Sequence, residues 1–169
     1  MKPHDIEELC NETSERIRIL DLKPHPEGGF YRRTFASDVT FTVNSDPFPR
    51  PIATAIYYLL PASGVSRLHR IDSDEMWHFY DGQPLTIVEL RRGSTHKETV
   101  LGRGKDQVSQ YVVPKDTWFG ALASSSGYSL VGCTVFPGLD FNHFQIGSRN
   151  FLHAVFPSST EVIDIMTLP

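Results

Sequence analysis

The sequence predicts an all-β domain, built as a sandwich or a closed barrel, with a helix at each end. Short runs rich in aromatic and β-branched residues follow one another from about residue 28 to residue 147, separated by turn residues. This spacing is typical of antiparallel sandwiches and barrels. No helical pattern between the runs is long enough for a crossover, which disfavours a parallel βαβ sheet. Examples of the predicted strands are Phe30–Phe35, Ala53–Leu60, Met76–Tyr80, Leu85–Leu90, Gln110–Val113 and Tyr128–Phe136.

The N-terminal end has the pattern of a helix over about residues 5–18. Its apolar positions fall near helical spacing, and glutamates occupy the remaining surface. The segment KPHPEGG at residues 23–29 follows, and its two prolines and paired glycines force a turn. The residues that form the apolar stripe are Ile6, Leu9, Cys10, Thr13 and Ile17.

The C-terminal end predicts a second helix, over about residues 158–167. Ser158 stands three positions before Glu161, which is the spacing of a capping box. We expect the buried stripe of this helix to comprise Val162, Ile163, Ile165 and Met166. The predicted layout is therefore helix, β-barrel, helix within one domain spanning residues 1–169.

Composition excludes several classes of protein. The 169 residues are 40% hydrophobic and 21% charged, as in an ordinary globular domain, and the net charge of −4 argues against nucleic acid as a partner. No apolar run has the length of a signal peptide core or a membrane span, so we expect a cytoplasmic protein with no membrane partner. Cys10 and Cys133 form no motif with each other, which argues against a disulfide scaffold or a cysteine zinc site.

The segment GVSRLHRIDSDEMWHFYDG at residues 64–82 concentrates the residues that could carry chemistry. It resembles the first cupin motif, in which a glycine precedes His-x-His, a glutamate and a second glycine. The spacing from His69 to Glu75 and on to Gly82 matches this motif. Ile71, however, stands where the motif has its second histidine, and the interval from Gly64 to His69 is one residue short.

The segment from Pro114 to Phe119 resembles the second cupin motif, Pro-x-Gly followed after two residues by histidine. Pro114 is kept, Asp116 replaces the glycine, and Phe119 replaces the metal-binding histidine. Two of the four ligand positions that the resemblance implies are therefore apolar.

More narrowly, the chain resembles a largely uncharacterised cupin family of bacteria and fungi. Its hallmarks here are HPEGGFYRRTF (25–35), SDEMWHFYDG (73–82) and LVGCTVFPGLDF (130–141), and the resemblance continues into FPSSTEVIDIMT (156–167). It implies a cupin double-stranded β-helix, a jelly-roll barrel, over about residues 28–147, with a ligand pocket inside. The fold also resembles that of dTDP-sugar epimerases, which work without a metal, although this likeness is an analogy of fold alone.

His69 and Glu75 are the candidate catalytic residues. Residues two apart on a strand face the same side, so positions 69 and 71 both point into the barrel, and a glutamate on the next strand can meet them. Three imidazoles and one carboxylate would bind Fe, Mn, Zn or Ni. Because Ile71 and Phe119 remove two donors, we expect no tightly held metal and no cofactor.

Two interpretations of the pair remain open. His69 and Glu75 can act on an organic ligand, His69 moving a proton that Glu75 orients. Alternatively they form an internal ion pair left from an ancestral metal site, which would add little stability.

His78 enters a second hypothesis, a metal-dependent dioxygenase or isomerase whose missing ligands come from His78 or water. If Glu75–Phe79 is a regular strand, however, Glu75 and Trp77 face inward while Met76 and His78 face outward. We therefore expect His78 at the surface or in an interface.

The candidate substrate-binding residues are Arg32, Ser66, Trp77, Trp118 and Phe119. Arg32 could clamp a carboxylate or phosphate with its planar guanidinium, or form a salt bridge at the rim. Trp118 and Phe119 would line the pocket if the second motif aligns, and aromatic walls suit a flat ring, a sugar face or a nucleobase as well as a filled core.

The leading functional hypothesis is a metal-independent cupin that binds a small molecule and isomerises or epimerises a sugar- or nucleotide-like compound. The alternatives are the metal-dependent enzyme and a non-catalytic ligand-binding or sensor module. Apolar and aromatic residues that face outward, Met76 and Tyr80 among them, predict a homodimer.

Overall fold

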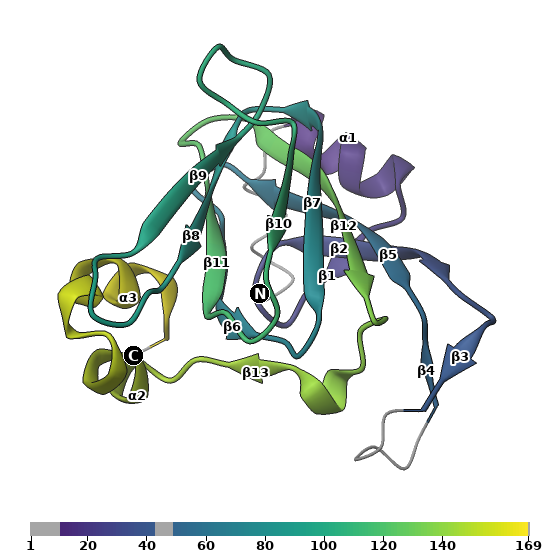
Figure 1. Ribbon diagram of the computed structural model, residues 1–169. Coiled ribbons are helices and arrows are strands. Elements are labelled where there is room, and N and C mark those ends of the chain that lie inside the picture. Colours follow the sequence, from purple (N-terminus) through teal and green to yellow (C-terminus); the bar gives the residue numbers. More distant parts are fainter. Residues whose placement is uncertain (1–10, 43–48, 169) are drawn as a thin grey trace.

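The computed structural model describes residues 11–42 and 49–168, and its main β-strands form two antiparallel β-sheets packed face to face (Figure 1). The predicted all-β barrel with terminal helices is therefore confirmed. In spatial order, the larger sheet consists of β1 (Lys23–Pro24), β2 (Phe30–Ala36), β5 (Thr54–Pro61), β12 (Tyr128–Phe136), β7 (Asp74–Gly82) and β10 (Gln110–Val113). The smaller sheet consists of β13 (Gln145–Ile146), β6 (Val65–Arg70), β11 (Phe119–Ala123), β8 (Leu85–Glu89) and β9 (Lys97–Leu101).

The remaining described elements lie at the ends of the chain or beside the barrel. They are α1 (Asn11–Ile19), the short pair β3 (Thr40–Phe41) and β4 (Arg50–Pro51), the 3-10 turns η2 (Phe141–His143) and η3 (Pro157–Ser159), α2 (Arg149–Val155) and α3 (Thr160–Met166). In the part of the chain that the structure describes, no helix is both long and apolar enough to cross a membrane.

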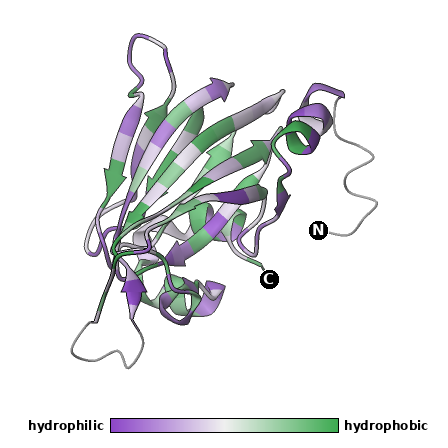
Figure 2. Cartoon of the chain, turned by 90° about the vertical axis from the view of Figure 1, so that its right-hand side faces the viewer, coloured by the Kyte–Doolittle hydropathy of each residue, from purple (hydrophilic) through white to green (hydrophobic). Residues whose placement is uncertain are grey.

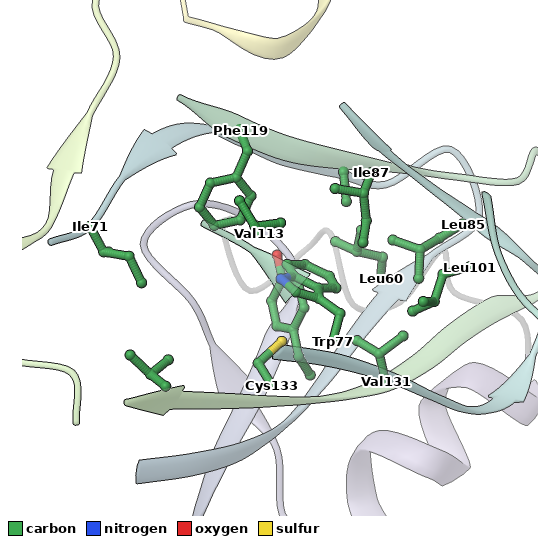
Figure 3. Close-up of a cluster of buried hydrophobic side chains, with 13 residues drawn as sticks. Leu60, Ile71, Trp77, Leu85, Ile87, Leu101, Val113, Phe119, Val131 and Cys133 are labelled. Carbon is green, nitrogen blue, oxygen red and sulfur yellow. The ribbon is translucent and has the colours of Figure 1, made fainter. Parts of the chain in front are cut away.

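The main core fills the space between the two sheets (Figure 3). Trp77, Phe119 and Tyr58 are its largest side chains, and each is 1% exposed. They come from β7, β11 and β5, so the two sheets meet through them. Hydrophobic and hydrophilic residues alternate along several strands (Figure 2), as expected when one face of each sheet is buried. Burying a large apolar side chain contributes about 1.5–3 kcal/mol, which makes this layer the main source of stability.

Helices cover the outer face of the smaller sheet (Figure 1). Leu152 of α2 and Ile163 and Met166 of α3 pack against a second apolar cluster that includes Leu68 and Trp118. The predicted C-terminal helix thus covers apolar residues on the outer face of the smaller sheet.

The outer face of the larger sheet is covered only in part. Ile17 of α1 and Leu22, which follows it, pack against Leu59 and Leu130 at one end of this face. Further along, Tyr80 is 41% exposed. The predicted homodimer on this face stays a prediction.

The helix boundaries differ from those expected. Residues 5–10 of the predicted first helix lie outside the described residues, and α1 covers the rest and ends at Ile19. The capping box is wrong, because Pro157 starts a 3-10 turn that shifts the cap of α3 to Ser159, which makes no side-chain capping bond. Ile165 is also misassigned. It is 56% exposed because it lies about 110° around the helix from the stripe of Val162, Ile163 and Met166.

Several elements were not predicted. The helix α2 was missed, and so were β9 and β11. β9 reads KETVL, whose charged residues hide its alternation, and β11 reads FGALA, whose small residues carry little β signal. Both strands are stabilised by pairing with β8, which hydrogen-bonds to β9 along one edge and to β11 along the other.

The Pro/Gly turn before β2 docks onto β6. The backbone N–H of Arg67 donates to the Glu27 carbonyl at 2.8 Å, and the Tyr58 hydroxyl donates to the Gly28 carbonyl at 2.8 Å. Gly28 has φ +112°, and a Cβ there would lie 2.2 Å from the carbonyl oxygen of Val65. Only glycine permits this approach, so Gly28 sets the position of Glu27 inside the barrel.

We predict that Gly28→Ala lowers the free energy of unfolding by about 3 kcal/mol, because left-handed strain and a backbone clash add together. Gly93→Ala is the matched control. Gly93 also has a positive φ, +69°, but a Cβ there would meet no atom within 4 Å, so a loss of about 1 kcal/mol is expected. Urea unfolding of both variants measures the difference. Equal losses of unfolding free energy would contradict the close approach of Gly28 to the Val65 carbonyl oxygen.

Candidate functional site

A narrow cavity opens between the sheets at the end of the barrel that carries the Pro/Gly turn. Its free volume is about 30 Å³, room for one or two water molecules. Acidic and imidazole side chains share it with apolar ones. The lining residues are His25, Glu27, Tyr31, Arg33, Thr54, Ile56, His69, Ile71, Glu75, Cys133, Val135, Leu139, Phe141 and Phe144.

Glu27 is the centre of the polar contacts in this cavity. Its side chain is buried, and its Oε1 accepts a hydrogen bond of 2.9 Å from the Ser66 hydroxyl. Its Oε2 lies 3.3 Å from Nδ1 of His69 and 3.7 Å from Nδ1 of His25. One carboxylate therefore contacts His25 of the turn and both Ser66 and His69 of β6.

The His69 ring is held in one orientation. Its Nδ1 lies 2.7 Å from the Arg67 carbonyl oxygen, which can only accept, so Nδ1 carries the proton. Phe119 and Phe144 flank the ring, with centroids 4.2 Å and 5.3 Å away. In the neutral ring the lone pair is consequently on Nε2, which makes His69 a candidate base.

His25 is the second imidazole of the cavity. The backbone N–H of Glu27 points at its Nδ1 from 3.4 Å, and the edges of Tyr31 and Tyr58 pack against its ring. Burial lowers the pKa of His25, and so does the neighbouring His69, while the Glu27 carboxylate acts in the opposite direction. Burial dominates, so His25 is neutral at neutral pH.

Glu75 projects inward from β7, where its neighbours are Val113 of β10 and Val135 of β12. Burial, and to a smaller extent the negative charge of Glu27, raises the pKa of Glu75 to about 8, although the Cys133 thiol and the Trp77 indole act to lower it. At neutral pH Glu75 is therefore mostly protonated and can donate a proton. Burial also raises the pKa of the Cys133 thiol well above its ordinary value, which leaves that thiol unreactive.

The structure brings His69 and Glu75 into one cavity, together with Ile71. Phe119 and Trp77 do not line it, and both lie in the main core (Figure 3). The indole N–H of Trp77 is buried with no hydrogen-bond partner among the described residues. Ser66 is also outside the lining, and its contribution is the hydrogen bond to Glu27.

Trp118 and Arg32 lie away from the cavity, contrary to expectation. Neighbouring residues on a strand face opposite sides, so the inward Phe119 sends Trp118 to the outside of the barrel, beneath the guanidinium of Arg70 at 5.0 Å. Arg32 likewise turns outward and lies over the Tyr57 ring at 5.6 Å. The arginine that reaches the cavity is Arg33.

His78 faces outward, as the strand alternation predicts. Its ring nitrogens lie 3.0 Å from Nε2 of Gln110 and 3.3 Å from the Thr134 hydroxyl. On that face it cannot join His69 and Glu75, so the hypothesis that His78 completes a metal site is wrong. Across residues 11–42 and 49–168, no group of three His, Cys, Asp or Glu side chains has the geometry to hold a metal ion.

Sequence reasoning missed Glu27, His25 and Arg33. The first two lie in a Pro/Gly turn, where polar side chains are normally solvated, and only the docking of that turn onto β6 buries them. The one available signal was the hallmark segment at residues 25–35, which contains all three.

Comparison with known proteins gives the family. The model of the family Cupin_5, described as Cupin superfamily (DUF985), matches residues 14–147. The chain belongs to this family. A protein of Shewanella oneidensis is 34% identical, with 95% of this cupin and 99% of that protein covered and a TM-score of 0.86. A hypothetical protein from Leishmania major is 29% identical, with 94% and 100% covered and a TM-score of 0.86.

More distant structures share the fold alone. Oxalate decarboxylase from Bacillus subtilis is 14% identical, with a TM-score of 0.53 over 86% of this cupin and 37% of the enzyme. No curated protein matched. The predicted membership of the cupin superfamily and the jelly-roll fold are thus confirmed.

We predict that Glu75 makes stability fall as the pH rises. Between its ordinary pKa of 4.5 and the folded value of about 8, the folded chain keeps the proton that the unfolded chain releases, so stability is fully present below pH 4.5 and is lost up to pH 8. Glu75→Gln cannot ionise, so its free energy of unfolding should exceed that of the wild type by on the order of 5 kcal/mol at pH 8.5, but not at pH 4.5.

Urea unfolding at the two pH values measures this difference. Glu15→Gln is the control, because Glu15 is exposed on α1 and its removal should leave the pH dependence unchanged. Parallel pH profiles for the wild type and Glu75→Gln would contradict the assignment.

Proposed function

We propose that this cupin binds a small polar molecule in the cavity and transfers a proton without a metal, as an isomerase or epimerase of a sugar- or nucleotide-like compound. One observation carries the proposal. A protonated carboxyl group, Glu75, and the imidazole of His69, whose Nδ1 carries the proton and whose Nε2 carries the lone pair, line the same buried cavity. Pairs of titratable groups in different protonation states are the usual basis of acid–base catalysis.

The chemistry follows from these two states. His69 Nε2 removes a proton from a carbon next to a carbonyl group, while Glu75 donates its proton to the carbonyl oxygen and an enol forms. The His69 imidazolium then returns its proton to the neighbouring carbon while Glu75 takes up a hydroxyl proton of the enediol, which gives an isomer. An epimer forms when water protonates the enol on its opposite face, the enol hydroxyl proton returns to Glu75 and His69 releases its proton to water. Glu27, 3.3 Å from Nδ1 of His69, stabilises the imidazolium that forms.

Metal independence is supported by the side chains at the positions that bind metal in other cupins. Ile71 and Phe119 have no donor atoms and are 4% and 1% exposed. A metal would also have to displace the proton of Glu75, whose pKa is about 8, and ligands must be deprotonated to bind.

We predict that the wild type, incubated in D₂O with a panel of hydroxy-aldehydes and hydroxy-ketones, exchanges deuterium into the carbon next to the carbonyl of its substrate. His69→Gln should slow this exchange by about 100-fold or more, the usual contribution of a general base. His96→Gln, a change far along the chain on the approach to β9, is the control. NMR spectra of the recovered compounds measure the exchange.

Binding of a compound without exchange would instead favour a non-catalytic binding module. Equal exchange by wild type and His69→Gln would reject the assigned base.

We predict that protein purified without added ions contains well under one transition-metal ion per chain, because only His69 and Glu75 remain at the four positions. Elemental analysis checks this. About one ion per chain, lost in Glu75→Ala, would establish the metal-dependent alternative instead.

A further inference from the structure

A second hollow adjoins the cavity at its mouth. It is an open depression of about 320 Å³ lined by Asp21, Lys23, Tyr31, Arg32, Arg33 and Phe141. Tyr31, Arg33 and Phe141 also line the cavity, so the two hollows share these three residues in their walls. A ligand in the cavity that contacts Arg33 would therefore lie next to this depression.

The depression is positively charged on a protein whose net charge is −4. Lys23, Arg32 and Arg33 contribute three positive charges and Asp21 one negative charge, a local balance of +2. Within residues 11–42 and 49–168, none of the three cations forms an ion pair with a carboxylate. Arg32 lies over the Tyr57 ring, a contact that orients the guanidinium without neutralising it. Three like charges gathered at one opening repel one another, and an anion would offset that repulsion.

The deep end of the cavity has the opposite character. Glu27 and Glu75 both line it, and each is less than 9% exposed. A ligand's anionic group placed there would face the Glu27 carboxylate in a poorly solvated space, which is unfavourable. The two ends therefore orient a ligand, with its anion outside and its neutral part inside. A free volume of about 30 Å³ limits that inner part to a few non-hydrogen atoms.

We propose that the ligand of this cupin carries an oxyanion, a carboxylate or a phosphate, which binds Arg33 at the cavity mouth with Lys23 and Arg32 beside it. This inference rests on the proposed function, because it takes the cavity as the ligand site. It narrows the substrate class to small anionic hydroxy-carbonyl compounds. Arg33 is the central residue because it lines both hollows, and its planar fork matches the oxygens of either anion.

Calorimetric titration of the full chain with inorganic phosphate and with malonate, at pH 7 and low ionic strength, tests the proposal. We expect measurable binding of at least one anion, and an affinity about tenfold lower in Arg33→Gln, the effect of one charge-assisted contact. Arg33→Lys should keep part of the affinity. Arg91→Gln, the same charge change at an exposed arginine after β8, should bind like the wild type.

Each outcome decides the matter. Arg33-dependent binding of phosphate alone assigns a phosphate ester, binding of malonate alone assigns a carboxylate, and binding of both assigns a site that accepts either. The proposal is overturned if the wild type binds neither anion, or if Arg33→Gln and Arg91→Gln lose the same amount of affinity.

The same data separate this inference from the proposed function. Deuterium exchange depends on His69 and does not use these anions. Exchange without Arg33-dependent binding would refute the anion site alone, and Arg33-dependent binding without exchange would refute the proton transfer alone.

Discussion

The buried carboxylate of Glu27 links the parts of this cupin on which its site depends. It lies in a turn whose backbone approaches β6 closely enough to require Gly28, and it accepts a hydrogen bond from Ser66 on that strand. From there it faces His69 and His25. Burying a carboxylate is costly unless hydrogen bonds and nearby positive or polar groups compensate, and the Ser66 hydroxyl and the Nδ1–H of His69 contribute to that compensation. The turn, the strand and the histidines are therefore positioned together.

The charge of Glu27 adds to the effect of burial on Glu75, the carboxyl group across the cavity. Two buried carboxyl groups in one small space cannot both ionise cheaply, and only Glu27 has a hydroxyl donor and two imidazoles beside it. Glu75 is surrounded mainly by apolar strand neighbours and keeps its proton. Because their surroundings differ, Glu75 is a protonated acid, whereas Glu27 is a carboxylate that supports His69 as the base.

The loss of metal-ligand residues has a structural counterpart in the core. Phe119 packs on the His69 ring and reaches Trp77 at 6.3 Å between centroids, so the position of the missing histidine has become part of the layer that joins the sheets. The same aromatic contact restrains the His69 ring. An apolar residue here both fills the barrel and orients the base, which ties the stability of the fold to the geometry of the site.

The sequence by itself determined the all-β class, most of the strands of the larger sheet, the inward pair His69 and Glu75, and the outward position of His78. Each depends on period-two alternation or on motif spacing, which are local properties. Tertiary structure alone decided that Glu27 and His25 are buried, that Arg33 rather than Arg32 reaches the cavity, and that Trp118 packs under the C-terminal helices. These outcomes depend on which distant surface a turn or strand edge meets, and no local pattern contains that information. The protonation states of the site residues were likewise decided by the tertiary structure, because burial and neighbouring charges exist only once the sheets have packed together.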